Sequence, residues 1–290
     1  MEKMMAEFHR MKDFVDQSLA QYIPNREPLL NVLVESINYT LHSGGKRVRP
    51  IFCLIVGEMF DVPMERLKSL ACSLEMIHTA SLIMDDLPHM DDAAVRRGRP
   101  ANHLVYGQDV ASLASIALLT RAYEVVLSDP DLPADKKVRV VQQLADTVGL
   151  DGLVGGQFVD LKYANETLSK AVVEYIHIHK TASLFVASGA TAAFIGEAEE
   201  VQVRALETYA ENLGSAFQIL DDLLNTEGNE QEMGKSLHSD ERNYVVLHGV
   251  TESKKAVQKH IEKALGAISI FDGKNAKLIA LCKMLMNRRS

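Results

Sequence analysis

The sequence predicts a single all-α domain, a bundle of long helices over residues 1–290, and three observations favour this fold class. All eight prolines lie at or before Pro133, so the rest of the chain lacks the residue that breaks helix interiors. Apolar residues recur at three- and four-residue spacing through several long segments. No stretch of useful length alternates apolar and polar residues, so we expect no sheet.

The individual helices follow from this periodicity. The first clear segment ends at an acidic cluster and carries Leu70, Leu74, Ile77 and Ser81 on one face. The same spacing continues in four later segments, residues 110–127, 138–148, 169–196 and 201–224. Polar connectors separate the helices at residues 41–47, 128–135 and 227–243. Residues 181–196 carry no charge, but they are too few to cross a bilayer and therefore predict a buried helix.

Composition narrows the partners and the compartment. The net charge of −8 argues against general nucleic-acid binding, which needs a basic surface field. Cys53, Cys72 and Cys282 are odd in number and lie mostly in apolar stretches, which predicts reduced core thiols. The first 21 residues mix charges of both signs and lack the apolar core of a signal peptide. We expect a cytoplasmic protein without stable membrane insertion, or an organellar stroma or matrix protein if a transit peptide was removed.

Two acidic clusters follow apolar runs. Asp85-Asp86 and Asp91-Asp92 come after residues 80–84, and Asp221-Asp222 come after residues 217–220. Neighbouring carboxylates repel one another and burial raises their pKa, a penalty that a divalent cation removes. Mg²⁺ is typically bound by one or two carboxylates together with substrate phosphates. Either cluster alone could be an exposed acidic helix end, but two of them favour magnesium and a diphosphate.

Basic residues accompany the acidic clusters. The segment Gly44-Gly45-Lys46-Arg47-Val48-Arg49-Pro50 joins two glycines to cations that suit phosphate oxygens. His78 precedes Asp85 by seven residues and so shares its helix face, although a core histidine is the ordinary interpretation. Arg96 and Arg97 suit bidentate phosphate contacts or, alternatively, ion pairs with Asp91 and Asp92.

Further polar residues are dispersed over the second half of the chain. Gly155-Gly156-Gln157 and Asp160 form a small polar patch, and Lys180-Thr181 begin the uncharged helix. Gln218 lies three residues before Asp221 on the same helix face. Lys180 could instead cap the helix or snorkel, and Lys235, in a polar loop, could be a solvated lysine. Together with the clusters, these residues predict a site that binds Mg²⁺ and two diphosphates above an apolar cavity.

Six motifs occur in a recognisable order, GGKRVRP, IHTASLIMDDLPHMDDAAVRRGRP, GGQFVD, HKTASL, FQILDD and MGK. On these motifs the chain resembles the trans-isoprenyl (polyprenyl) diphosphate synthases, most of all the short-chain farnesyl and geranylgeranyl enzymes, from about Leu29 to Arg288. The resemblance implies helices around a central apolar cavity. It also implies a magnesium-dependent prenyltransferase that joins isopentenyl diphosphate head-to-tail to dimethylallyl, geranyl or farnesyl diphosphate, and a homodimer.

The resemblance assigns roles to individual residues. Asp85 and Asp91 would bind two of three Mg²⁺ ions with support from Asp86, and Asp221 would bind the third. The allylic diphosphate would be bound by Arg96, Lys180, Thr181, Gln218 and Lys235. Isopentenyl diphosphate would be bound by Lys46, Arg49, His78 and Arg97. Ala80 and Ser81, five and four residues before Asp85, would line the product cavity, where the small Ala80 leaves room for a C20 product, with C15 and C25 as alternatives.

Three departures from the family pattern set limits on this interpretation. The second acidic motif ends in Asn225 in place of Asp, and the loop 237–244 is short, with Arg242 as the one candidate for a second cation. Ser115-Ile116 replace the Gly-Asp pair of relatives, near the expected dimer interface. A non-catalytic regulatory subunit of a heteromeric synthase is therefore an alternative. A class I terpene cyclase is a further alternative, since it would share an aspartate-rich motif and a helical fold. Such an enzyme would not need the GGKRVRP segment, which the resemblance assigns to isopentenyl diphosphate.

Overall fold

The computed structural model describes residues 2–24, 27–163, 169–227 and 244–286, and the all-α prediction is confirmed. The α-helices of these ranges are α1 (Glu2–Tyr22), α2 (Asn31–Leu41), α3 (Val48–Met59), α4 (Lys68–Asp85), α5 (Asn102–Tyr106), α6 (Gln108–Leu127), α7 (Ala134–Val148), α8 (Leu153–Lys162), α9 (Lys170–Ile176), α10 (Ser183–Ile195), α11 (Glu200–Glu227), α13 (Tyr244–Ala267) and α14 (Ala276–Met286). The shorter helical segments are the 3₁₀ turns η1 (Pro28–Leu30), η2 (Met64–Leu67) and η4 (Ile268–Ile270) and the π-helix η3 (His177–Ala182).

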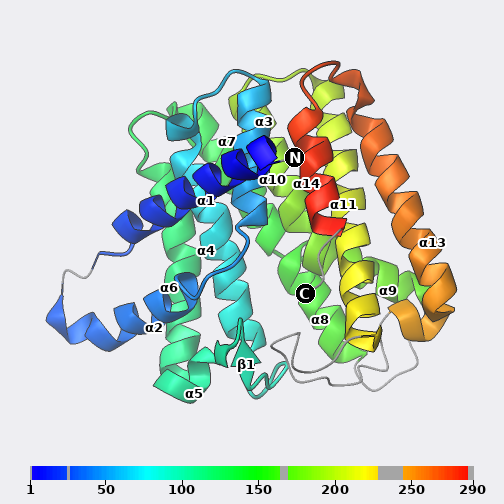
Figure 1. Ribbon diagram of the computed structural model, residues 1–290. Helices are drawn as coiled ribbons and strands as arrows, with labels where there is room; N and C mark the ends of the chain where they lie inside the picture. Colours follow the sequence, from blue (N-terminus) through cyan, green and yellow to red (C-terminus); the bar gives the residue numbers. More distant parts are fainter. Residues whose placement is uncertain (1, 25–26, 164–168, 228–243, 287–290) are drawn as a thin grey trace.

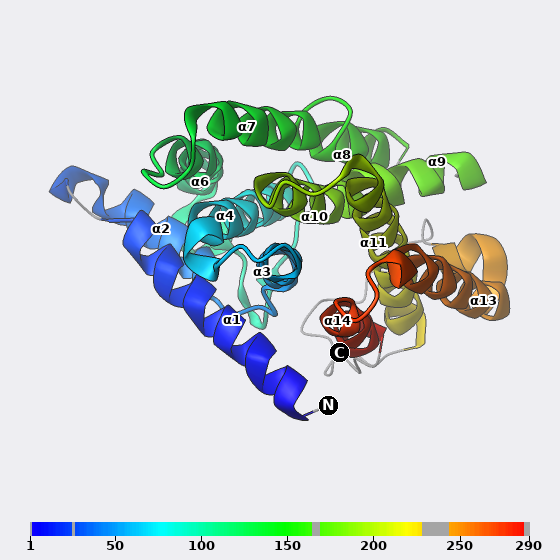
Figure 2. The same cartoon turned by 90° about the horizontal axis from the view of Figure 1, so that it is seen from above.

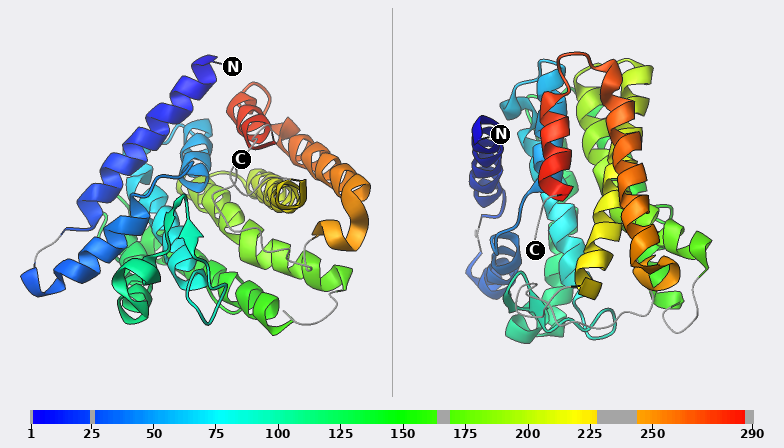
Figure 3. Two further views of the ribbon diagram at one scale, coloured as in Figure 1. Left: turned by 60° about the horizontal axis from the view of Figure 1, so that its bottom comes forward. Right: turned by 45° about the vertical axis from the view of Figure 1, so that its right-hand side comes forward.

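The long helices α3, α4, α10 and α11 run side by side through the middle of the molecule (Figure 1). Helix α1 crosses one side of this group, α6 and α7 cover another, and α13 packs along α11 (Figure 2). The further views show the lower ends of α4 and α11 at the same end of the bundle (Figure 3). The C-terminal ends of these two helices therefore lie at the same end of the bundle (Figure 3).

Helix α10 is the most deeply buried of these elements, as the uncharged run predicted. Ten of its thirteen residues are buried, among them Leu184 and Phe185. The core around α10 is one apolar cluster with contributions from helices as distant in sequence as α1 and α14, for example Met11 and Leu281. All three cysteines lie in this interior as free thiols, which agrees with the sequence prediction.

Two local features differ from the sequence prediction. A short antiparallel hairpin pairs β1 (Val95–Arg96) with β2 (Arg99–Pro100). Its two turn residues, Arg97 and Gly98, have φ of 52° and 72°, the left-handed backbone that tight hairpin loops require. The expected continuous helix 169–196 is interrupted by the π-helix, which separates α9 from α10.

Helix α6 is the one described helix with the length and apolarity of a membrane span. The core helices of soluble proteins often have the same length and apolarity. One of its faces is buried against α4 through Ala111, Ala114 and Leu118. The Ser115 hydroxyl donates to the Ala80 carbonyl of α4 at 2.7 Å, so this departure from the family pattern joins the two helices. Ile116, on the other side of α6, is 55% exposed.

Candidate active site

The first acidic cluster lies where α4 ends. Asp85 is the last residue of the helix, and the following segment turns back so that the Asp91 amide donates to the Asp85 carbonyl at 2.9 Å. Asp92 adopts φ 47° and its amide donates to the Leu87 carbonyl, which completes the turn. The turn therefore brings Asp91 next to Asp85, although five residues separate them in the sequence.

Burial and mutual repulsion raise the pKa values of two of these carboxyl groups, Asp85 and Asp86. The pKa of Asp85 is raised to about 6, first by burial and then by Asp91 and Asp86, while Lys180 and Arg96 oppose the change. The pKa of Asp86 is also raised by burial, against the effect of Arg96. Closely spaced carboxylates that resist ionisation are hard oxygen donors that fit Mg²⁺. Within the described residues no group of three or more His, Cys, Asp or Glu side chains is placed to hold a metal ion. Mg²⁺ is commonly bound by one or two carboxylates together with substrate phosphates.

Asp86 and Arg96 form an ion pair next to this cluster. The Arg96 Nε donates to Asp86 Oδ1 at 2.9 Å, and Nη2 contacts the same oxygen. Asp86 is only 1% exposed. The sequence had suggested Asp91 and Asp92 as ion-pair partners of the arginines, and for Arg96 the partner is Asp86. The hairpin β1–β2 carries Arg96 back to α4 and makes this pair possible.

Lys180 reaches the acidic cluster from the π-helix. A Cβ on Gly156 of α8 would lie 2.5 Å from the Lys180 backbone nitrogen, so only glycine allows α8 to pack this closely. Asp160, one turn further along α8, binds Lys180 Nζ at 2.6 Å. Burial opposes the charge of Lys180, but Asp160, Asp91 and Asp85 together raise its pKa. The GGQFVD motif therefore positions a lysine whose charge is favoured by Asp160 and by Asp85 and Asp91 of the first cluster.

Hydrogen bonds join the π-helix to the second acidic cluster on α11. Thr181 Oγ1 donates to Gln218 Oε1 at 3.0 Å, and Gln218 Nε2 donates to Asp222 Oδ1 at 3.2 Å. The other oxygen of Asp222 accepts the Tyr244 amide at 2.9 Å, at the first residue of α13. Asp222 is thus a buried structural residue, a role that the sequence alone did not assign. Burial lowers the pKa of Arg49 to about 10, and Asp221, like Glu75, opposes this change.

The basic residues gather beside these carboxylates. Arg97 Nη1 donates to the Gly44 carbonyl at 2.6 Å, and the Arg49 guanidinium lies 4.6 Å from the centre of the Phe185 ring. Lys46 is an exposed residue of the same loop as Gly44. The pKa of His78 is lowered well below its usual value by burial and by the surrounding arginines, which keeps this imidazole neutral at pH 7. These four residues are the ones the sequence predicted for isopentenyl diphosphate.

The remaining predicted residues lie either on α4 before the acidic cluster or outside the described residues. Ala80 is buried at 2% exposure, and the Ser81 hydroxyl donates to the His78 carbonyl. Lys235 and Arg242, like the side chain of Asn225, lie outside the described residues. The central apolar cavity stays a prediction.

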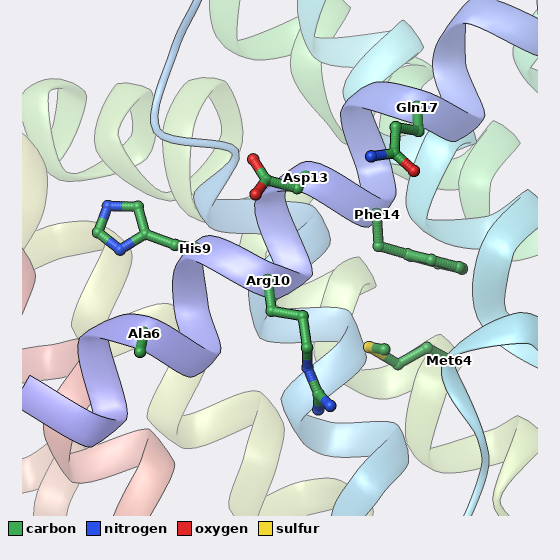
Figure 4. A pocket seen from close by; sticks show the side chains of 7 residues that line it. All are labelled: Ala6, His9, Arg10, Asp13, Phe14, Gln17 and Met64. Carbon is green, nitrogen blue, oxygen red and sulfur yellow. The ribbon is translucent and has the colours of Figure 1, made fainter.

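A surface hollow of about 580 Å³ lies between α1 and the turn at Met64 (Figure 4). Six residues of α1, among them Arg10 and Phe14, line the hollow together with Met64. No residue predicted for the site is among them.

A helical bundle with two acidic clusters and a group of arginines is suited to metal-assisted transfer between diphosphate substrates. The polyprenyl synthetase family model matches residues 30–280, and the chain belongs to that family. A geranylgeranyl diphosphate synthase from Cyanophora paradoxa is 41% identical over 97% of this chain and 95% of its own. A farnesyl diphosphate synthase from Geobacillus stearothermophilus is 37% identical over 97% and 96%.

Solved structures agree with this assignment. An FPP/GFPP synthase from Zymomonas mobilis superposes with a TM-score of 0.89 at 26% identity, and the match covers 98% of this chain and 99% of that one. A geranyltransferase from Helicobacter pylori, solved in complex with magnesium and isoprenyl diphosphate, has a TM-score of 0.87 at 26% identity over 98% and 96%.

Proposed function

We propose that this protein is a magnesium-dependent trans-prenyltransferase, folded as one domain, that condenses isopentenyl diphosphate with an allylic diphosphate to give geranylgeranyl diphosphate. The observation that carries the proposal is the placement of Lys180, whose Nζ is bound by Asp160 at 2.6 Å and whose pKa is raised, against the effect of burial, by Asp160, Asp91 and Asp85. A cation beside two metal-binding carboxylates is suited to a diphosphate that bridges protein and metal.

The acidic half of the site would hold the metal. Asp85, Asp91 and Asp221 would bind three Mg²⁺ ions, and Asp86 would support the first cluster through its ion pair with Arg96. Bound magnesium would neutralise the charge that develops on the departing allylic diphosphate. Support comes from the carboxylate set described above and from the Helicobacter pylori structure, which contains magnesium.

Cationic and polar side chains of the protein would hold the two diphosphates in separate places. Lys180, Thr181, Gln218 and Arg96 lie on the acidic side and would bind the allylic diphosphate, together with Lys235. Lys46, Arg49, His78 and Arg97 lie on the basic side and would bind isopentenyl diphosphate. A neutral His78 can donate one hydrogen bond to a phosphate oxygen without adding to the repulsion among the arginines.

The condensation would then take place between the two bound diphosphate substrates. When the allylic C–O bond breaks, its electron pair leaves with the diphosphate, and the allylic cation accepts the electrons of the isopentenyl double bond. Loss of one proton from the isopentenyl unit to the released diphosphate forms the new double bond. The donors on Lys180 and Arg96 stabilise the leaving charge. Apolar side chains around the bundle core exclude water, which would otherwise capture the cation.

The C20 product rests on Ala80. A small side chain at this position leaves room for a longer prenyl chain, and relatives described as geranylgeranyl synthases support this length. The farnesyl synthase among the relatives keeps a C15 product as the near alternative. We place the enzyme in the cytoplasm or in an organellar stroma or matrix, because all three thiols are free and several relatives are described as chloroplastic.

We further propose a homodimer formed through α5 and α6. Leu104, Leu113 and Ile116 are each more than half exposed, and the last two share one face of α6. A second copy would cover this apolar face. Leu113→Glu should reduce the mass measured by light scattering to that of one chain, whereas Ile270→Glu, at an exposed apolar position on η4, should leave it unchanged. A monomeric wild-type protein contradicts the proposal.

The activity is tested by incubating the protein with Mg²⁺, isopentenyl diphosphate and each of three allylic primers, dimethylallyl, geranyl and farnesyl diphosphate. We expect a C20 prenyl diphosphate by mass spectrometry. A C15 or C25 product would correct the chain length and keep the reaction. No elongation with any primer, in a folded protein that still binds diphosphate, would favour the regulatory-subunit alternative.

A further inference from the structure

Glu75 is a buried carboxylate that the reaction outlined above does not use. It lies in the middle of α4 among apolar residues, and only 2% of its surface is exposed. A charged side chain at such a position is costly unless it is paired. Two arginine side chains contact it, Arg47 at 2.5 Å and Arg97 at 3.6 Å, both at the Oε1 atom.

Arg47 is committed to structural contacts at all three of its nitrogens. Its Nε donates to Asp16 of α1 at 2.8 Å, Nη1 to Glu75, and Nη2 to the Leu41 carbonyl at 2.6 Å. The residue caps α3 with φ 50° and its side chain is 1% exposed. Arg47 therefore joins α1, α2 and α4, and it determines the path of the adjoining loop, which carries Lys46.

Arg97 holds the same loop from the other side. It contacts Glu75 through Nη2 and the Gly44 carbonyl through Nη1. Gly45 packs directly on the guanidinium, since a Cβ there would lie 2.9 Å from Arg97 Cζ. Glu75 thus fixes the loop through Arg47 and fixes the hairpin arginine that lies against it.

Glu75 is also the counter-charge that three arginines share. It opposes the effect of burial on Arg47, Arg49 and Arg97, and for each of them it comes first among the charges that raise the pKa. Arg97 in turn lowers the pKa of Arg49, so the arginines repel one another. Without this carboxylate, cations packed into one small volume would separate or draw in solvent.

We propose that Glu75 is the positioning residue of the isopentenyl-diphosphate half of the site, acting through Arg47 and Arg97 without touching the substrate. This inference rests on the proposed function, because it assigns the basic cluster to that substrate. The N-terminal helix α1 contributes to the same positioning, since Asp16 of α1 supplies the second carboxylate that binds Arg47.

Two simpler views of Glu75 lead to different results. If Glu75 acted only by long-range electrostatic repulsion of the substrate, Glu75→Gln would strengthen binding of the anionic diphosphate, because a negative charge is removed. If Glu75 only stabilised the fold, the substitution would lower the amount of active protein and leave both KM values unchanged. Positioning alone predicts that binding of one substrate weakens selectively.

The test measures binding of isopentenyl diphosphate by calorimetry and both KM values by initial rates. For Glu75→Gln we expect the Kd and KM of isopentenyl diphosphate to rise about tenfold or more, with the KM of the allylic primer within about twofold. Glu75→Asp, which keeps the charge on a shorter side chain, should recover part of the loss. Asp16→Asn should produce a smaller rise of the same selectivity.

Glu58→Gln is the matched control, because it removes a carboxylate that pairs with Lys277 on the surface, and no change in either KM is expected. An unchanged or lower KM for isopentenyl diphosphate in Glu75→Gln overturns the inference, as does an equal rise for both substrates. If Glu75→Gln fails to fold, Asp16→Asn decides, and the absence of a selective rise there overturns the inference as well.

The binding and activity measurements together distinguish a failure of the role of Glu75 from a failure of the proposed function. A wild-type chain that binds isopentenyl diphosphate but elongates no primer refutes the proposed function, while the calorimetric comparison still decides the role of Glu75. A chain that elongates normally with an unchanged Kd in Glu75→Gln refutes the role of Glu75 alone. A wild-type chain that does not bind isopentenyl diphosphate refutes both.

Discussion

Replacing Asp85 by asparagine should stabilise the metal-free protein while it removes activity. The reason is the pKa of this carboxyl group, which burial and the neighbouring Asp91 and Asp86 raise from 3.8 to about 6. The folded protein therefore binds the Asp85 proton more tightly than the unfolded chain does. At neutral pH folding has to keep this group ionised in surroundings that favour the neutral form, and a neutral amide removes that cost.

The size of the effect follows from linkage. Each pKa unit corresponds to about 1.36 kcal/mol, so a rise from 3.8 to about 6 costs on the order of 3 kcal/mol at pH 7. The stabilising contribution of the bound proton is fully present below the unfolded pKa and is lost as the pH rises through the folded pKa. At pH 5 the cost falls to roughly half of its value at pH 7. For a chain of this size, 3 kcal/mol corresponds to a shift in Tm of roughly 6–12 °C.

Thermal unfolding in EDTA at pH 7 and at pH 5, at equal protein concentration, measures this difference. Asp85→Asn should unfold at the higher temperature at pH 7, and its advantage over the wild type should shrink at pH 5. The exposed neighbour Asp92 provides the control, since Asp92→Asn changes the charge equally and should leave Tm nearly unchanged. If Asp85→Asn is no more stable than the wild type at pH 7, or if its advantage is the same at both pH values, the reasoning is refuted.

Three further predictions concern packing, product length and metal. Gly156→Ala should lower the free energy of unfolding in urea by about 1–3 kcal/mol, because its Cβ would meet backbone atoms of Lys180 at 2.5 and 2.9 Å. Gly266→Ala on α13 has open space around it and should not lower the free energy of unfolding. Equal effects of the two substitutions would contradict the packing argument. Ala80→Tyr should shorten the main product when products are sized by mass spectrometry, and an unchanged length removes Ala80 from the account. Chelation of Mg²⁺ should raise the Kd of the allylic diphosphate more than about tenfold and that of isopentenyl diphosphate less than about twofold. Calorimetry measures both constants, and an equal response of the two substrates would contradict this prediction.

The parts of the structure that sequence could predict depend on local pattern. Three- and four-residue spacing placed a helix that ends at the first acidic cluster, and α4 indeed ends at Asp85. The uncharged run after Lys180 predicted a buried helix, and α10 is buried because its residues offer apolar or small side chains in every direction. Such patterns are properties of one segment, so a single sequence reveals them.

The remaining features depend on contacts between segments. The pairing of Arg96 with Asp86 requires a hairpin whose turn includes Arg97 at φ 52°, a conformation that non-glycine residues adopt rarely. The π-helix at Lys180 has no apolar period of its own, and the close approach of Gly156 from α8 accompanies it. Glu75 did leave a signal, as the one acidic residue within the apolar α4 segment before Asp85, but its partners come from a distant loop.

The two halves of the site balance their charges in different ways, and two carboxylates of α4 make the contrast clear. Glu75 belongs to the basic half and supplies internally the counter-charge that the arginines need, so its neutralisation should weaken both the fold and the site. Asp85 belongs to the acidic half, where Lys180 and Arg96 are already shared with Asp160 and Asp86. Its charge must be balanced from outside the chain, by metal and substrate, so its neutralisation should strengthen the fold and disable the site. This opposite sign at positions 75 and 85 of one helix follows from where the counter-charge resides, and it is the reason to expect an isopentenyl site that forms without metal and an allylic site that requires it.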